Sequence, residues 1–319
     1  MSKQFDFFLT IILVFYLRIG LVGGGGSLSL DDSPYMNTHF LAYYRSVAER
    51  LMMNDSFQEV YFSTRDNYTL NGLLRVHAHA RATIIIFCGW VPGRKEGVAS
   101  LIPMFSEHEF NLLLVDARGH GKSQGKRPWR TIKSLGIHES QDVIAAIEFL
   151  NRVVDKPIII WGTCAGAFYA AHALVQLTEE KMIETYKIKG LIFDSGWASP
   201  VEVAWQTPVG FIKTSVHPRV QKMFINLYGV LFNRFLKPAL EKESYRMSLL
   251  DKIHKISVPI FYIHSVNDIF ANFSSVQQLY ERTQSKCHWW IEGNAHATHQ
   301  LKYKHEYRDH LLNFCNSIL

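Results

Sequence analysis

A cysteine occupies the apex of a strand–turn–helix pattern, a position at which a side chain can act as a nucleophile. A short β-branched run, Ile158–Trp161, leads into Gly162-Thr163-Cys164-Ala165-Gly166, and an alanine-rich helical pattern follows. Glycines on both sides of a strand–turn–helix apex allow neighbouring backbones to approach closely. The N-terminus of the following helix favours the thiolate, which is the reactive form of cysteine. We therefore interpret Cys164 as a nucleophile rather than as a buried structural thiol.

A thiol nucleophile at such an apex needs a base, and two histidines late in the chain are candidates. His296 lies three residues after Gly293, in a loop-like stretch that follows the strand pattern 286–291. His299 lies closer to the start of the last predicted helix. A base that must reach across to the nucleophile is best carried on a loop, so the sequence favours His296 and leaves His299 as the alternative.

The acid that orients this histidine should come from a strand end between the nucleophile and the base. Asp268 fits, because it ends the turn Ser265–Asp268 directly after the strand pattern 260–264. A carboxylate there can accept the proton on the far imidazole nitrogen and so fix the tautomer. Asp194, which ends the strand pattern 190–194, is the alternative. Nucleophile, acid and histidine thus follow one another in that chain order.

Two backbone N–H groups are predicted to bind the oxyanion. Ala165 directly follows the nucleophile, and Trp90 follows the strand pattern 83–88.

The stretch Asp116–Ser123 ends in Gly-Lys-Ser like a phosphate-binding loop, but the position of the first glycine of that motif is Asp116, whose carboxylate would repel phosphate. The four cysteines follow no metal-ligand spacing. We therefore expect no metal and no organic cofactor.

Strand and helix patterns alternate along the chain in the way that a parallel sheet requires. The expected strands are 58–63, 70–77, 83–88, 111–116, 157–161, 190–194, 259–264 and 286–291, and the expected helices are 35–52, 97–106, 137–154, 165–177 and 301–315. The fold class is α/β, a mostly parallel, doubly wound sheet. The aromatic-rich, helical stretch 196–255 interrupts the alternation, and we interpret it as a cap over the carboxyl edge of the sheet.

Composition bounds the partners and the compartment. The chain has 319 residues, a net charge of +6 and no long Lys/Arg run, so a nucleic-acid partner is not expected. The apolar run Phe7–Leu17 and the glycines 23–26 indicate that residues 1–26 are a signal peptide or membrane anchor with a linker, followed by one domain over 27–319. We accordingly expect a membrane-anchored or exported protein, associated with the membrane through this segment, rather than a cytoplasmic one.

Taken together, the motifs resemble those of the α/β-hydrolase superfamily, in its capped esterase, lipase and serine-aminopeptidase-like branch. The resemblance covers about Gln58 to the C-terminus. It is carried by Phe87-Cys-Gly-Trp90, Asp116-Ala-Arg-Gly-His-Gly-Lys-Ser123, Gly162-Thr-Cys-Ala-Gly166, His264-Ser-Val-Asn-Asp268 and Gly293-Asn-Ala-His296. Two positions depart from the usual pattern: Cys88 replaces the histidine before the oxyanion donor, and Cys164 replaces the elbow serine. The elbow with Cys164 at its centre is similar to the cysteine elbows of dienelactone hydrolases and polyhydroxyalkanoate synthases.

The resulting hypothesis is a hydrolase of esters or thioesters that acts on a small acyl substrate. Cys164 attacks the carbonyl, His296 moves the proton, Asp268 orients His296, and the N–H groups of Ala165 and Trp90 bind the oxyanion. An acyltransferase with the same three side chains is one alternative. A non-catalytic, membrane-tethered binding module that retains the fold is the other. No motif indicates the acyl group or the oligomeric state.

Overall fold

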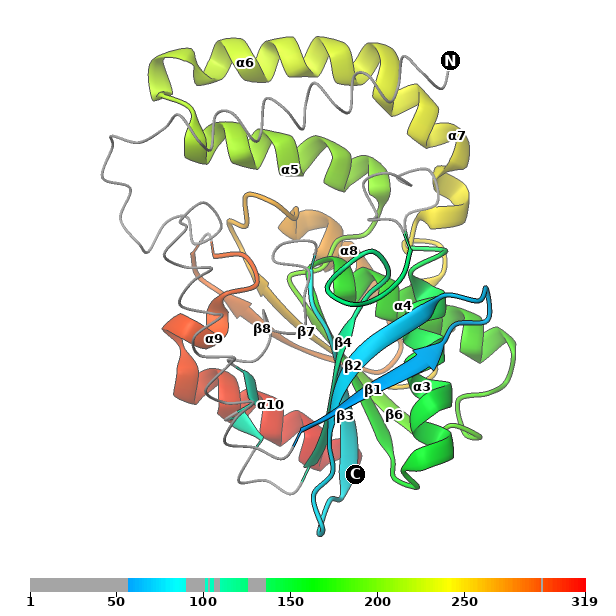
Figure 1. Cartoon of the computed structure of the whole chain (residues 1–319). Helices are drawn as coiled ribbons and strands as arrows, with labels where there is room; N and C mark the ends of the chain where they lie inside the picture. The colour runs from blue at the N-terminus through cyan, green and yellow to red at the C-terminus, as the bar shows by residue number, and fades with distance from the viewer. Residues whose placement is uncertain (1–56, 90–100, 103, 106–109, 126–135, 294) are drawn as a thin grey trace.

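The computed structural model shows an α/β domain built on one twisted sheet (Figure 1). It describes residues 57–89, 101–102, 104–105, 110–125, 136–293 and 295–319. The expected helix 35–52 and most of the expected helix 97–106 lie outside the described residues, and so does Trp90.

The strands follow the predicted order with small shifts of their ends. They are β1 (Gln58–Ser63), β2 (Thr69–Arg75), β3 (Ala82–Phe87), β4 (Phe110–Asp116), β5 (Ile158–Thr163), β6 (Ile188–Asp194), β7 (Ile260–Ser265) and β8 (Lys286–Ile291). The helices are α3 (Ser140–Val153), α4 (Ala165–Glu179), α5 (Pro200–Ser215), α6 (Pro218–Leu231), η4 (Phe232–Leu236), α7 (Lys237–Met247), η5 (Ile253–Lys255), α8 (Phe273–Arg282), α9 (His299–Lys302) and α10 (Lys304–Ile318).

The eight strands form a single sheet in the order β1-β2-β4-β3-β5-β6-β7-β8. β1 pairs with β2, and β2 with β4, in antiparallel fashion; all other neighbours are parallel. The prediction of a mostly parallel α/β sheet is therefore confirmed. Parallel pairing brings the carboxyl ends of β5, β6 and β7 to one edge. There Asp194 ends β6, and Cys164 and Asp268 follow β5 and β7.

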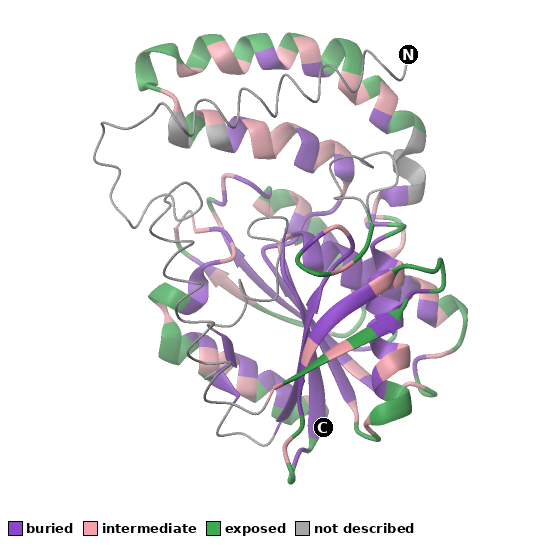
Figure 2. Cartoon of the chain, in the orientation of Figure 1, coloured by how far each residue is buried: buried purple, intermediate pink, exposed green. Residues whose placement is uncertain are grey.

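The central strands are buried on both faces, which explains their uninterrupted β-branched sequences. Every residue of β3 (ATIIIF) and of β5 (IIIWGT) is buried, and the centre of the sheet is uniformly purple in Figure 2. Alternate side chains enter two separate hydrophobic clusters. Ile160 packs on the side of α3 and α4, whereas Trp161 packs on the side of α10. Two covered faces hold the strand ends, and with them the site, in fixed positions.

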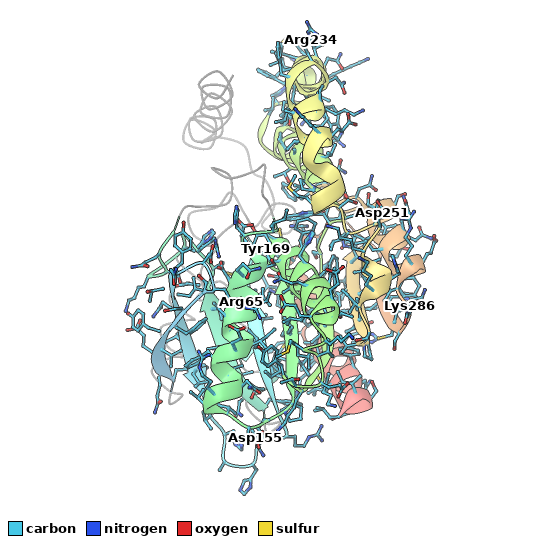
Figure 3. All side chains as sticks on the ribbon, turned by 90° about the vertical axis from the view of Figure 1, so that its right-hand side faces the viewer. Arg65, Asp155, Tyr169, Arg234, Asp251 and Lys286 are labelled. Atoms are coloured by element: carbon cyan, nitrogen blue, oxygen red, sulfur yellow. The ribbon has the colours of Figure 1, made fainter. Side chains whose placement is uncertain are left out.

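Between β6 and β7 the chain forms α5, α6, η4 and α7, which we name the helical insertion. It lies beyond the carboxyl edge of the sheet in Figure 1, and Figure 3 shows Arg234 at its far end. It has a small core of its own, made by Ala204, Val209, Tyr228, Phe232 and Leu240. Pro200 and Pro218 each occupy the first turn of a helix, where their missing N–H groups cost nothing. Its action as a cap, and the domain limits 1–26 and 27–319, stay predictions.

The predicted location, membrane-anchored or exported, is contradicted. Among the residues that the structure describes, no helix is both long enough and apolar enough to cross a bilayer. Spanning the hydrocarbon core takes about 20 apolar residues, whereas the apolar run on which the prediction depended has only eleven, Phe7–Leu17, and lies outside the described residues. We withdraw this prediction.

Candidate active site

Cys164 adopts a backbone conformation that few side-chain-bearing residues tolerate. Its φ is 55° and its ψ is −117°, and it forms the N-cap of α4. Such a conformation costs about 1–3 kcal/mol and persists only where the surroundings enforce it. Its N–H donates to the carbonyl of Asp194 at 2.8 Å, and its carbonyl accepts from the N–H of Ala167 at 3.2 Å. These bonds tie the strained residue to β6 on one side and to α4 on the other.

Three glycines make room for this strand–turn–helix. A Cβ on Gly162 would lie 2.3 Å from the backbone N of Ala167, and one on Gly166 would lie 2.3 Å from the carbonyl O of Phe87. A Cβ on Gly89 would lie 2.8 Å from the Cβ of Cys164. None of these three positions admits a larger residue without movement of its neighbour, so close packing of α4 on β3 and β5 depends on them.

His296 connects Cys164 to Asp268. Its Nδ1 donates to Oδ2 of Asp268 at 2.7 Å, and its side chain also forms a hydrogen bond with the side chain of Cys164. Burial alone would lower the pKa of His296. The negative charges of Asp268 and of a Cys164 thiolate outweigh that effect and raise the pKa well above its ordinary value. The protonated imidazole is therefore the favoured form when both anions are present.

Asp268 is held as an anion by a turn built around it. Oδ1 accepts from the N–H groups of Phe270 (2.8 Å) and Ala271 (3.0 Å). Burial raises the pKa of Asp268, but the charge and the hydrogen bond of His296 hold it below its ordinary value. Behind it lies His264, whose Nε2 is 3.7 Å from Oδ2 and donates to the carbonyl of Ala271. Burial lowers the pKa of His264 despite the nearby Asp268 charge, which favours the neutral imidazole.

The two alternatives, Asp194 and His299, meet each other instead of the thiol. Nδ1 of His299 lies 3.3 Å from Oδ1 of Asp194, and its Nε2 bonds the hydroxyl of Ser265 at 2.9 Å. Tyr307 donates to Oδ2 of Asp194 at 2.6 Å, and Ser195 donates to Oδ1 at 2.8 Å. Both ring nitrogens of His299 are thus directed at groups other than Cys164.

Sequence reasoning missed the groups that surround these carboxylates. His264, Ser195 and Tyr307 have polar side chains that are fully enclosed, with no exposed surface at all. In the sequence, Tyr307 fits an apolar position of the last helix, and its spacing carries no sign of a hydroxyl partner. A buried tyrosine generally has such a partner, and this was the available signal. Of the two expected oxyanion donors, Ala165 begins α4, where N–H groups have no intrahelical acceptor, and Trp90 lies outside the described residues.

The comparisons with known proteins place the chain in a family. Residues 83–317 match the model of a family described as the alpha/beta hydrolase fold. The chain belongs to the α/β hydrolase fold family. A hydrolase is accordingly the function class that these comparisons support.

Three similar proteins are distant in sequence. The YqkD protein of Bacillus subtilis is 25% identical over 255 residues, which are 79% of this chain and 76% of that protein. The Pf2001 esterase of Pyrococcus furiosus is similar in structure with a TM-score of 0.64 at 20% identity, covering 85% of this chain and 93% of the esterase. A proline iminopeptidase of Mycobacterium smegmatis has a TM-score of 0.60 at 13% identity, covering 82% and 98%. At these identities the structural likeness concerns the fold alone.

Proposed function

We propose that this α/β hydrolase cleaves esters or thioesters through a Cys164–His296–Asp268 triad and a covalent acyl-enzyme. The observation that carries the proposal is the pair of contacts made by His296, with the Asp268 carboxylate at 2.7 Å and with the Cys164 side chain. One imidazole is thereby oriented by an acid and joined to a nucleophile, which is the arrangement that acyl transfer requires.

In the first half-reaction the Cys164 sulfur forms a bond to the substrate carbonyl carbon. The resulting oxyanion is bound by backbone N–H groups, of which Ala165 supplies one at the start of α4. The tetrahedral adduct then collapses, the bond to the leaving alcohol or thiol breaks, and His296 gives that group its proton. Asp268 stabilises the imidazolium that exists before this transfer.

In the second half-reaction His296, now neutral, takes a proton from water. The hydroxide attacks the thioester carbonyl, the C–S bond breaks, and the acid leaves as the cysteine–histidine pair re-forms. The helical insertion lies beyond the strand ends that carry these side chains, and its aromatic residues support an apolar acyl group as substrate. The proposal includes a small acyl molecule as the partner and requires no metal or organic cofactor.

Turnover of p-nitrophenyl esters and acyl thioesters of increasing chain length tests the proposal. The expected result is turnover by the wild type that is lost in Cys164→Ala. Wild-type turnover that survives in Cys164→Ala would overturn it. Cys164→Ser is the matched variant, because it keeps a nucleophile but removes the sulfur: activity in the serine variant alone would mean that the cysteine is used for something other than hydrolysis.

Two further measurements distinguish the alternative functions. Adding an alcohol or an amine and analysing the products separates a hydrolase, which yields only free acid, from an acyltransferase, which yields the new ester or amide. The rate of Cys164 alkylation by iodoacetamide separates both from a binding module. We expect alkylation faster than that of a free thiol, and slower in His296→Gln; a rate equal to that of a free thiol in both proteins would favour the binding module.

A further inference from the structure

The first helix of the insertion, α5, contacts the turn that carries Asp268 near the helix N-terminus. We name residues 268–272 the acid turn. Glu202 in the first turn of α5 accepts from the N–H of Asn272 through Oε1 at 2.9 Å, although the two residues are 70 positions apart. Its Oε2 accepts from the N–H of Ala198 at 3.2 Å, and its side chain also bonds Ser275. One carboxylate therefore joins the start of α5, the end of the acid turn and the start of α8.

A second contact lies two turns further along α5. A Cβ on Gly210 would lie 2.7 Å from the carbonyl O of Ile269 and 2.9 Å from the ring of Phe270. Contacts under 3.0 Å are closer than any real side chain accepts, and one of the two atoms belongs to backbone. Helix α5 is therefore in close contact with the middle of the acid turn, at a distance that only glycine permits.

Phe270 links this contact to both charged groups of the site. Its N–H donates to Oδ1 of Asp268 at 2.8 Å. Its ring packs against the imidazole of His296, with centroids 5.4 Å apart and an interplanar angle of 53°. A displacement of Phe270 by α5 would consequently change the orientation of Asp268 and the packing of His296 together.

We propose that α5 is a positioning element for the Asp268–His296 pair, with Glu202 and Gly210 as positioning residues that act through the acid turn. The inference rests on the proposed function and adds a role for the insertion that is separate from enclosing substrate. Neither residue touches the reacting atoms. Both hold the backbone N–H groups and the ring that in turn hold the acid and the base.

Gly210→Ala is the direct test, and Gly229→Ala is its matched control. A Cβ on Gly229 in α6 meets the ring of Trp205 at an ordinary 3.4 Å, so this variant makes the same chemical change without pushing on the acid turn. Both variants gain the same helix propensity, because each replaces a helical glycine by alanine. We expect kcat to fall about 10- to 100-fold in Gly210→Ala, with KM changing less, and to stay at the wild-type value in Gly229→Ala.

A readout independent of turnover keeps this test separate from the proposed function. The pKa of His296 can be followed by NMR titration, with its signal assigned by comparison with His296→Gln. A displaced acid turn weakens the contact with Asp268, so Gly210→Ala should lower this pKa. The other titratable groups near the pair are Cys164, His264, His299 and, next to Asp268, Glu202. The titration is informative even if no substrate is turned over.

Two milder variants cover the case in which Gly210→Ala does not fold. Glu202→Gln retains one acceptor oxygen but places an NH₂ group against a backbone N–H, and Phe270→Leu removes the ring while leaving the backbone bond to Asp268. Both should lower the His296 pKa and kcat. An unchanged His296 titration and unchanged kcat in folded Gly210→Ala, Glu202→Gln and Phe270→Leu would overturn the proposal, whatever becomes of the triad.

Discussion

Two buried histidine–aspartate pairs lie side by side in this protein, and only one of them contacts the thiol. His296 and His299 are three residues apart, and their partners Asp268 and Asp194 lie at the carboxyl ends of the neighbouring strands β7 and β6. In the first pair the nitrogen distal to the acid is left for Cys164. In the second pair that nitrogen bonds Ser265, and the acid receives two further hydroxyl groups.

The difference between the two histidine–aspartate pairs shows that residue type alone does not determine which pair is suited to catalysis. The Asp194 carboxylate accepts two hydroxyl donors and lies 3.3 Å from Nδ1 of His299 in a sealed environment, which suits a structural centre. The backbone of Asp194 also contributes to the site, because its carbonyl accepts a hydrogen bond from the N–H of Cys164. One pair is therefore suited to move a proton, and the other to hold the strand end on which the nucleophile depends.

The sharpest way to break this comparison is to remove each histidine in turn. We expect His296→Gln to lower kcat about 10²- to 10⁴-fold while the protein stays folded, because a general base is lost. His299→Gln should change kcat less than about ten-fold per folded molecule. Steady-state turnover together with circular dichroism makes the measurement. Equal loss of kcat in two folded variants would show that the pairs do not have separate roles.

The pH dependence of stability should separate the pairs next. The pKa of His296 is raised well above its ordinary 6.5 in the folded state. Its contribution to the free energy of unfolding is then fully present below about pH 6.5 and is lost as the pH rises through the raised value. Urea unfolding at about pH 6 and at successively higher pH should show the wild type losing its advantage over His296→Gln as the pH rises. An advantage that grows with pH would contradict the ion-pair interpretation.

Tyr307→Phe should affect stability without affecting catalysis. The substitution removes the donor to a buried carboxylate, and such a bond is worth about 2 kcal/mol. We expect the free energy of unfolding, measured with urea, to fall by that amount. The kcat should stay within about two-fold of the wild-type value. Tyr303→Phe is the control, because within the described part of the chain its hydroxyl has no hydrogen-bond partner. A large loss of kcat in Tyr307→Phe would move the second pair into the mechanism.

Ser265→Ala should give the smallest effect. The substitution removes the Ser265 hydroxyl, which lies 2.9 Å from Nε2 of His299 and is its hydrogen-bond partner. This loss should lower the free energy of unfolding by about 1 kcal/mol. Thermal melts and urea curves would measure this loss against Ser274→Ala, a change at an exposed position. A destabilisation no greater than that of the control would mean that the hydrogen bond contributes nothing net.

Much of the fold could be predicted because its strands are buried on both faces. The runs in β3 and β5 contain few residues that a loop or a surface helix would use, so their positions were predicted within two residues. The ends of helices were less accurate. The last helix was expected over 301–315, but a break at Tyr303 divides it into α9 and α10. Tyr303 has φ −117° and ψ 42°, a local conformation that apolar spacing does not reveal.

The candidate site could be predicted only as far as local sequence determines it. The elbow at Cys164 is local, because its glycines and its strand and helix are contiguous. The choice between His296 and His299 is not local, because the backbone bends between them at Ala297, which has a φ of 52° and donates its N–H to the hydroxyl of Ser195. Nothing in the residues 296–299 indicates that bend. The contact of Glu202 with the acid turn cannot be predicted from local sequence either, because it joins segments 70 positions apart.

The position of the helical insertion has a consequence for how this protein can diverge. β6 and β7 are adjacent in the sheet, and the whole insertion leaves and returns between them. The entropy of closing such a loop grows slowly, by about 0.6 kcal/mol for each doubling of its length. Descendants of this chain can therefore lengthen, shorten or replace α6 and α7 at little cost to the sheet. Since α5 is tied to the acid turn, we expect homologues to vary in the outer two helices first, and to keep the length and register of the inner one.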